Sequence, residues 1–595
     1  MRNKSSQVFP APAPSSPVAG PAGASPLRCR KGNIFTRHPM MTVFVFTFVC
    51  LFPVMLTRDF TPSNELRYLS IANEALADGH IFAFYNHGLA YADKPPLYFW
   101  IVMLCRLLFG HHSCLALSMF SLIPAFVITG IMDKWVMKGK SAMDRMALAG
   151  MTLTCVMFLG TMIVLRMDML MCLFIVLALW TFYRMYTGEV ARKSDSVLLP
   201  VWIFLALFTK GPVGLLMPPL SIAVFLIVKR DWKGFGKYLG LKTWGIIAGL
   251  AALWISCVWI EGGSEYINNL LVKQTVGRAV NAFTHAKPFW FYLVTILWCL
   301  APYTLLLIGS FMASLLPVRN TCVEETSGQA QSKVGISDTS DASNCPKQGR
   351  SDLEILFLCT IISTVAMLSS FSSKLPIYLV PVLPFCVYLF PIVLDRIGKR
   401  GWMRWGVGIF SIIFTVIGLA ALPVLFGAVK IPVLNDLLTE YPFALEAPII
   451  NGIILLTLAN ILGIWFLLKR KVWNIPALLL GAGLFLAVFS ASAVVKDINP
   501  YIGYGSICSK VPEGTDVATV FLHRPENIDA YIGRQITDYG KEPERLVEAV
   551  SASDKPLTII TRTSRLETIP ELQKLFSNGT VLYSGPYCLT TISKK

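Results

Sequence analysis

Five short polar segments interrupt the apolar runs of this 595-residue chain, and each carries charged side chains. They are residues 58–95, Arg166-Met167-Asp168, Thr209-Lys210-Gly211-Pro212, residues 261–288 and Ser372-Ser373-Lys374-Leu375-Pro376. Ionisable groups at membrane depth are costly and tend to be functional. An isolated lysine at a span end is explained equally well as an anchor that reaches the headgroups. The presence of five such segments favours a binding or catalytic site.

The first polar segment holds the densest set of chemical groups. Asn64-Glu65-Leu66-Arg67-Tyr68 precedes an amphipathic stretch, and Asp93-Lys94-Pro95-Pro96 follows it. The Lys-Pro-Pro turn fixes the chain direction and places a cation at the membrane surface. There the Lys94 ammonium could pair with a lipid phosphate. Glu65 and Arg67 also have a simpler interpretation, as charges at the start of a helix.

The composition identifies the elements that must position these residues. The chain is 54% hydrophobic and 15% charged, and it contains apolar stretches such as 41–57, 145–165 and 403–427. Crossing a hydrocarbon core takes roughly 20 residues. We therefore predict a polytopic α-helical membrane protein, which excludes soluble enzymes, nucleic-acid factors and secreted disulfide scaffolds. The net charge of +17 fits Lys and Arg in cytoplasmic loops and requires no nucleic acid partner.

We predict about thirteen membrane spans. They are 41–57, 113–133, 145–165, 169–186, 196–209, 212–229, 242–260, 289–316, 353–371, 376–394, 403–427, 448–468 and 474–494. A fourteenth apolar segment, 96–110, is short and contains Arg106, so we interpret it as an interfacial or re-entrant helix. With a cytoplasmic N-terminus, the strongly basic short loops then fall inside, as the positive-inside rule requires. The five polar segments and the C-terminal tail fall outside.

The chain divides into three parts. Residues 1–40 are predicted to form a disordered, basic cytoplasmic N-terminus without a cleavable signal. Residues 41–494 form the membrane module. It includes a first outer loop (residues 58–112) with interfacial helices and a disordered cytoplasmic insertion at 318–352. Residues 495–595 form a small extracytoplasmic α/β domain.

Alternating and periodic patterns predict the elements of the C-terminal part. Strands are expected at Val517–Leu522, Leu557–Thr561 and Thr580–Tyr583, with helical stretches at 541–551 and 567–576. Cys508 and Cys588 lie in this part, on the oxidising side of the predicted topology. They form either a disulfide or two buried thiols.

The order of these motifs resembles that of the GT-C membrane glycosyltransferases. Asn64 to Tyr68 and Asp93-Lys94-Pro95-Pro96-Leu97-Tyr98-Phe99-Trp100 resemble the opening of that superfamily. The nearest branch contains the lipid A aminoarabinose transferases, which are related to the protein O-mannosyltransferases. Four later motifs continue the resemblance through residues 45–385: Arg166-Met167-Asp168, Thr209-Lys210-Gly211, Gln274 to Arg278 with His285-Ala286-Lys287-Pro288, and Ser373-Lys374-Leu375-Pro376-Ile377-Tyr378.

The resemblance implies a fold and an activity. It implies transfer of a sugar, an aminoarabinose-like pentose or a hexose, from a polyprenyl-phosphate carrier to an outer-leaflet acceptor. The acceptor is expected to be lipid A or a related glycolipid. The enzyme would lie among the lipids of the bacterial inner membrane as a multi-pass protein, with its active site facing the periplasm. One alternative is a protein O-glycosyltransferase of the mannosyl type. Another is a non-catalytic lipid-carrier binder or a transporter, although we find no internal repeat.

The resemblance also implies roles for individual residues. Cations would stabilise the charge on the departing lipid phosphate, and the candidates to bind that phosphate are Arg67, Lys94, Lys210, Arg278, Lys374 and Tyr378. The catalytic candidates are Asn64, Glu65, Lys94 and Asp168, and His285 belongs to the acceptor loop. A divalent metal cation could be held by Asp93 and Asp168, unless these carboxylates pair with Lys94 and Arg166.

Asn64 departs from the family pattern, which has an Asp-Glu pair at this point. An amide is not a base, although it can orient a hydroxyl or a phosphate. Either Glu65 or Asp59 takes the role of the acid, or the acceptor needs no base because it is a phosphate that is already ionised. A third possibility is a weakened or inactive enzyme.

Overall fold

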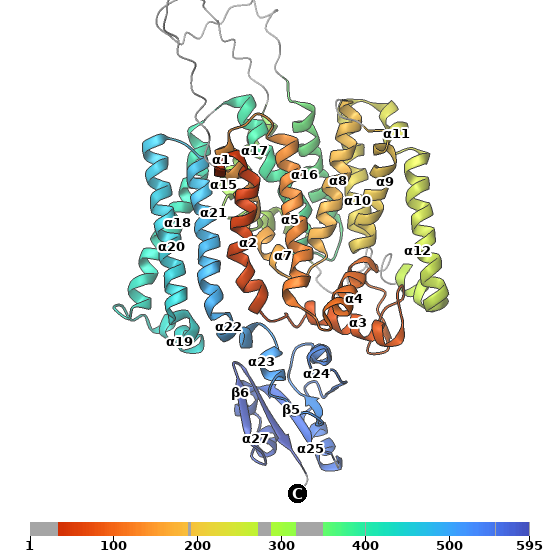
Figure 1. Ribbon diagram of the computed structural model, residues 1–595, viewed down its shortest axis with the longest axis vertical. Coiled ribbons are helices and arrows are strands. Elements are labelled where there is room, and N and C mark those ends of the chain that lie inside the picture. Colours follow the sequence, from red (N-terminus) through yellow and green to blue (C-terminus); the bar gives the residue numbers. More distant parts are fainter. Residues whose placement is uncertain are drawn as a thin grey trace, which may run out of the picture.

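The computed structural model describes residues 34–188, 192–271, 287–316, 349–398, 400–553 and 555–593. Long helices stand side by side as a bundle, and a smaller unit with a β-sheet lies at one end of it (Figure 1). Helices α3 (Glu65–Asp78) and α4 (Leu97–Phe109) lie at that same end, and α11 (Trp232–Tyr238) lies at the opposite end. The predictions for residues 1–33 and for most of the insertion 318–352 lie outside the described residues.

Ten helical segments of the described chain are long and apolar enough to cross a membrane, or up to eleven if one bent pair counts as a span. Their helices are α2 (Pro39–Thr57), α5 (Cys114–Val136), α8 (Asp168–Thr187), α10 (Pro212–Lys229), α12 (Leu241–Asn268), α16 (Asp352–Ser370), η2 with α17 (Pro376–Val382 and Leu383–Ile397), α18 (Gly401–Leu425), α20 (Ala447–Arg470) and α21 (Asn474–Ala491). Each coincides with a predicted span.

The predicted count of thirteen is not confirmed, because three predicted spans are short or broken. Residues 145–165 form α6 (Ala142–Thr154) and α7 (Val156–Ile163), which meet at 70°. Residues 196–209 lie in the 16-residue α9 (Asp195–Lys210), and 289–316 divides into α14 (Phe291–Cys299) and α15 (Thr304–Leu315). Pro302 lies in that last break, where a residue without an N–H cannot continue the hydrogen-bond ladder. Helix α4, with 13 residues, is too short to count as a span, and its interfacial place stays a prediction.

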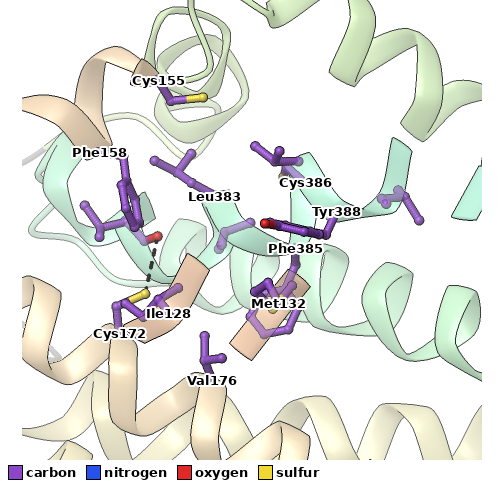
Figure 2. Packing of buried hydrophobic residues seen from close by; sticks show 14 of the residues in the cluster. Ile128, Met132, Cys155, Phe158, Cys172, Val176, Leu383, Phe385, Cys386 and Tyr388 are labelled. Carbon is purple, nitrogen blue, oxygen red and sulfur yellow. Dashed lines mark hydrogen bonds between the residues drawn. The ribbon is translucent and has the colours of Figure 1, made fainter. Parts of the chain in front are cut away.

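The bundle core is a continuous cluster of buried apolar side chains contributed by most of the central helices. Figure 2 shows part of it, where Met132 of α5, Val176 of α8 and Phe385 of α17 pack together. Cys172 also lies in this cluster, and its thiol faces the carbonyl oxygen of Val380 at 3.9 Å. Buried cysteines of this kind act as small hydrophobic residues.

The C-terminal unit (residues 495–593) contains a five-stranded sheet in the order β4-β3-β5-β7-β6. Strand β3 pairs in parallel with β4 and β5, whereas β7 is antiparallel to β5 and β6. Three strands lie where the sequence predicts them: β3 (Asp516–Thr519), β5 (Leu557–Arg562) and β6 (Val581–Ser584). The sequence pattern did not reveal β4 (Thr537–Asp538) and β7 (Tyr587–Ile592).

Helices join these strands and connect the unit to the bundle. They are α22 (Val495–Ile502), α23 (Gly505–Cys508), η5 (Pro525–Ile528), α24 (Asp529–Ile532), α25 (Pro543–Ala552), α26 (Thr563–Thr568) and α27 (Pro570–Phe576). Helices α25 and α27 occupy the two predicted helical stretches. The remaining elements are α1 (Ile34–Arg37), the hairpin β1 (Tyr85–Asn86) and β2 (Leu89–Ala90), α19 (Pro432–Glu440), η3 (Pro442–Leu445) and η4 (Ser492–Val494).

Of the two states predicted for Cys508 and Cys588, the structure has two free, buried thiols and not the disulfide. Cys508 packs in an apolar cluster shared with Phe60 of the first outer loop. Cys588 packs in a separate cluster with Leu572, and its thiol faces the carbonyl oxygen of Thr561 at 3.8 Å. The two sulfurs therefore serve different packing layers, and a bridge needs two cysteines whose side chains meet.

Candidate active site

A buried ion pair anchors the start of the first outer loop. Arg58 donates two hydrogen bonds to the Glu65 carboxylate, at 2.7 and 2.9 Å, and the two side chains are 7% and 1% exposed. The carboxylate also accepts the backbone N–H groups of Thr61 (2.7 Å) and Leu165 (2.6 Å). Burial alone would raise the pKa of Glu65, but the Arg58 charge and these hydrogen bonds outweigh it and lower the pKa. Glu65 is thus fully engaged in holding the loop.

Asp59, the other candidate for the missing acid, ties the loop to the C-terminal unit. Its carboxylate accepts hydrogen bonds from the Gly505 N–H at 2.7 Å and from the Tyr531 hydroxyl at 2.5 Å. Its own N–H donates to the side-chain oxygen of Asn499 at 2.9 Å. Burial raises the pKa of Asp59, against the effect of those two hydrogen bonds. Neither Glu65 nor Asp59 is therefore available as an unengaged base.

Tyr531→Phe should weaken the attachment of the C-terminal unit to the bundle. The Tyr531 hydroxyl donates to Asp59 and accepts the Phe60 N–H at 3.1 Å, so its loss removes two partly buried hydrogen bonds, and Asp59 keeps only the Gly505 N–H among these donors. Each such loss costs about 1–3 kcal/mol. We expect a lower Tm of the full-length protein and faster proteolytic release of the C-terminal unit. The matched control is Tyr583→Phe, whose side chain is 55% exposed; equal behaviour of the two variants would contradict the prediction.

Asp168 joins two of the polar segments at one point. It is buried at the start of α8, and the Lys210 ammonium at the end of α9 pairs with it directly. Arg166 approaches the same carboxylate at 3.4 Å. The Lys210 ammonium also lies over the Tyr378 ring, 4.7 Å from its centre. Segments far apart in the sequence therefore place two cations beside one carboxylate, and one of these cations also lies over an aromatic ring.

Tyr68 of α3 lies among these charges and those of the Asp93-Lys94 turn. Burial raises the pKa of Tyr68 to about 12, with the charges of Arg166 and Arg67 opposing the rise and those of Asp168 and Asp93 adding to it. Lys94 pairs with Asp93 at 3.3 Å. The cluster thus has four cations, Arg67, Lys94, Arg166 and Lys210, and two carboxylates, Asp93 and Asp168. Its formal charge is 4 − 2 = +2.

Lys374 was predicted to bind the same phosphate as the cations of this cluster, but its contacts are different. Its ammonium donates to the backbone oxygens of Lys287, at 3.1 Å, and Phe371. An apolar groove of about 510 Å³ runs between α14, α15, α16 and α17, and its lining includes Phe289 and Ser369. Each of these two residues is two positions from a partner of Lys374. The backbone partners of Lys374 are therefore close in sequence to two lining residues, although the buried Lys374 does not itself line the groove.

The Asn64 side chain has no partner in the described part of the chain. Asn64 is half-buried at the N-cap of α3, yet its side chain makes no capping hydrogen bond. The neighbouring Ser63 is held from two sides, because its carbonyl oxygen accepts from Arg67 at 2.8 Å and its hydroxyl lies 3.2 Å from His523 Nε2. The Asn64 amide is thus free to bind a substrate group.

The structure brings most of the sequence-predicted residues together. The charged cluster contains Arg67, Asp93, Lys94, Asp168, Lys210 and Tyr378. Lys374 donates instead to backbone oxygens near the groove. Arg278 and His285 lie outside the described residues. Arg166 was expected only as a possible partner of Asp168, and no role was predicted for Tyr68. Arg166 is two positions from Asp168, and Tyr68 is three positions from Glu65. Their closeness to predicted site residues is the one feature of the sequence that could have indicated them.

The two carboxylates proposed to hold a metal each have a protein cation beside them. Asp93 pairs with Lys94, and Asp168 pairs with Lys210 and Arg166. Among the residues that the structure describes, no group of three or more His, Cys, Asp or Glu side chains is arranged to hold a metal ion. This arrangement does not fit a divalent cation, which needs several oxygen ligands that are not already neutralised.

Comparison with known sequences shows partial matches. Residues 93–259 match the family described as dolichyl-phosphate-mannose-protein mannosyltransferase. An undecaprenyl phosphate-alpha-4-amino-4-deoxy-L-arabinose arabinosyl transferase from Edwardsiella ictaluri is 27% identical over 258 residues, which are 42% of this chain and 45% of that protein. Its counterpart from Enterobacter sp. (strain 638) is 23% identical over 287 residues, 47% of this chain and 50% of that protein. The chain thus spans about half the length of the curated relatives it matches.

Comparison with solved structures covers nearly the whole chain. The crystal structure of ArnT from Cupriavidus metallidurans bound to undecaprenyl phosphate matches with a TM-score of 0.68 and 17% identity. The match covers 93% of this chain and 98% of that chain. The chain has the same fold as that protein. The fold predicted from the order of the motifs is confirmed, and it brings motifs from distant segments together at one end of the bundle.

Proposed function

We propose that this chain is a membrane glycosyltransferase that moves a sugar from a polyprenyl-phosphate carrier to an acceptor at the membrane surface. The observation that carries the proposal is the excess of two positive charges in the cluster around Tyr68. When the bond between the sugar and the phosphate oxygen breaks, the lipid phosphate leaves with an added negative charge. Prearranged cations stabilise such a charge strongly in a site with little water.

The apolar groove supports the lipid part of the donor. It offers about 510 Å³ between apolar side chains, and the backbone acceptors of Lys374 are each two positions from a lining residue. A polyprenyl chain would lie in this groove with its phosphate directed toward the cations. The relatives are named as undecaprenyl phosphate-aminoarabinose transferases, and the matching ArnT structure holds undecaprenyl phosphate. We propose a donor of this class, carrying a pentose or hexose, in the bacterial inner membrane with the site facing the periplasm.

The chain's own residues divide the work between donor and acceptor. Lys94 and Arg67 bind the donor phosphate, and Asp168 fixes the positions of Lys210 and Arg166. The Asn64 amide orients the acceptor. The carboxylates described in this site all have partners, so none is left as an unengaged base. That favours an acceptor that is already ionised, such as a phosphate of lipid A or a related glycolipid. Because residues 93–259 match the mannosyltransferase family, a protein O-mannosyl type acceptor is the second candidate.

Asn64→Asp distinguishes these acceptor classes. A carboxylate at this position would serve a hydroxyl acceptor as a general base, a contribution worth about 10²–10⁴ in rate. A phosphate acceptor gains nothing of this kind. We therefore expect turnover of Asn64→Asp to stay within about tenfold of the unchanged enzyme, with Asn64→Ala as the steric control. A rise of a hundredfold or more, measured with labelled donor, would show that the acceptor is a hydroxyl.

The proposed function is tested by mass spectrometry of lipid A from cells with and without the gene. Loss of a mass increment equal to one sugar in the deleted strain supports the transferase and identifies the sugar and the acceptor. Unchanged lipid A would move the acceptor to protein or another glycan. A radiolabelled polyprenyl-phosphate sugar then separates the classes, since a transferase consumes it and a transporter leaves it chemically unchanged.

A further inference from the structure

A second group of cations lies in the C-terminal unit, apart from the charged cluster of the bundle. A cavity of about 480 Å³ is lined by Lys541, Arg562 and Arg565, together with Phe521, Ser564 and Thr568. Phe521 follows strand β3, Lys541 follows β4, and the other residues end or follow β5. The cavity therefore opens at the carboxyl ends of the three parallel strands.

The strand order makes this edge of the sheet a favoured place for a ligand. The chain leaving β3 turns toward β4 on one side, whereas the chain leaving β5 passes through α26 and α27 to β6 at the opposite edge. The loops after β3 and β5 thus diverge, although the strands are neighbours. In open α/β sheets, ligands bind in the crevice at such a divergence.

The backbone at the cavity is held in an unusual shape. Phe521 has a φ of 57°, and its N–H donates to the carbonyl oxygen of Gly540 at 2.7 Å. A bulky side chain in this left-handed region is strained, and such residues concentrate at binding sites. The Arg565 guanidinium lies over the Phe521 ring, 5.6 Å from its centre. The ring thus helps to orient one of the cations at the cavity.

The three cations lack carboxylate partners in the described part of the unit. Lys541, Arg562 and Arg565 are exposed, and the lining of the cavity contains no acidic residue. The ion pairs within the unit are Arg524 with Glu526 and Arg545 with Glu542. Three like charges around one cavity repel each other, so an anionic ligand would relieve that repulsion.

The cavity lies on the side of the unit that meets the first outer loop. His523, two residues after Phe521, contacts the hydroxyl of Ser63, the residue before Asn64. Ser70 of α3 donates to Asp529 of α24 at 2.8 Å, and Figure 1 shows this part of the unit beside α3. An acceptor whose reacting end lies at Asn64 would extend past this junction.

We propose that this cavity binds a phosphate group. Two arginine forks and one ammonium match the charge and the oxygens of a phosphate better than those of a neutral sugar. We assign this phosphate to the head group of the acceptor, as a second contact remote from the reacting end. That assignment rests on the proposed transferase function, whereas phosphate binding does not.

The test is calorimetric titration of the full-length protein with inorganic phosphate, in nanodiscs of phosphatidylcholine. The titrations use a Lys94→Gln background, so that phosphate bound at the charged cluster of the bundle contributes less to the measured heat. We expect saturable binding that Arg562→Gln combined with Arg565→Gln weakens at least about tenfold. Arg545→Gln, which alters an exposed arginine of the same unit, should leave binding unchanged. Absence of binding, or equal binding in the double variant with an intact circular dichroism spectrum, would overturn the proposal.

Two further measurements separate the source of the phosphate and the proposed function. Nanodiscs that contain phosphatidic acid should compete with inorganic phosphate if the site accepts a lipid head group; lack of competition would overturn the acceptor assignment and leave a site for free phosphate. In otherwise unchanged enzyme, Arg562→Gln should raise the acceptor KM about tenfold and leave the donor KM unchanged. Phosphate binding in a protein that transfers no sugar would contradict the proposed function, but it would still support a phosphate site in this cavity.

Discussion

Replacing Glu65 with glutamine should destabilise the protein by about 3–5 kcal/mol, because it leaves the buried Arg58 without its charge partner. The present pair is bidentate and buried at the start of the first outer loop. The carboxylate also bonds the N–H of Leu165, in the segment that leads to Asp168. We therefore expect a large fall in Tm together with loss of transfer, measured by thermal unfolding in detergent and by turnover of labelled donor.

A double replacement separates positioning from catalysis. Arg58→Met with Glu65→Leu removes both charges, so the penalty of an unpaired buried ion disappears. Folding should then recover in part, and transfer with it, if Glu65 acts only by holding the loop. Recovery of Tm with no recovery of transfer would show that Glu65 takes part in the chemistry. A normal Tm in the single variant Glu65→Gln would contradict the structural role.

Lys94→Gln should lower kcat about 10²–10³-fold without unfolding the protein. The Lys94 side chain is 17% exposed, and its ion pair is to Asp93, which is 3.3 Å away and 14% exposed. When Lys94 is replaced, the Asp93 carboxylate still accepts a hydrogen bond from the Tyr91 hydroxyl at 3.3 Å, so it keeps a partner. The loss falls on the transition state, where the phosphate gains negative charge, so kcat should decrease more than donor binding. Single-turnover kinetics with labelled donor measure both quantities.

Two variants control this experiment. Lys140→Gln removes a lysine that follows helix α5 and pairs with Asp395 of α17, and it should leave turnover unchanged. Lys94→Arg keeps the charge but changes its geometry, so it should restore part of the activity. Near-normal turnover in Lys94→Gln would remove this lysine from the proposed site.

The sequence predicts the helices and the meeting of their ends well, for a simple physical reason. Each motif stands where an apolar run stops, and charge parity assigns the ends to one side of the membrane. Lys210 ends α9 and Asp168 starts α8, so two adjacent helices present them at the same level. The bent and divided spans were missed because hydropathy measures composition over a window, whereas a bend depends on packing.

Pairings between distant segments were not predictable in the same way. Glu65 has the residue type of a general base, and only its contacts with Arg58 and Leu165 reveal that it is a buried anchor. Nothing in the spacing of Cys508 and Cys588 indicates that they lie in different packing layers. A single sequence gives residue types and local periodicity, but it does not show which distant segments are in contact.

The contact between the loop and the C-terminal unit also has a consequence for biogenesis. Asp59 bonds Asn499, 440 residues later in the chain. At a synthesis rate of about 5–20 residues per second, the loop waits roughly 20–90 seconds for that partner. During this interval the early helices are in the membrane while the residues around Asn64 lack their final support. A ribosome that stalls before residue 495 would leave a membrane-inserted but incomplete chain, and cellular proteases would meet it first at this unsupported loop.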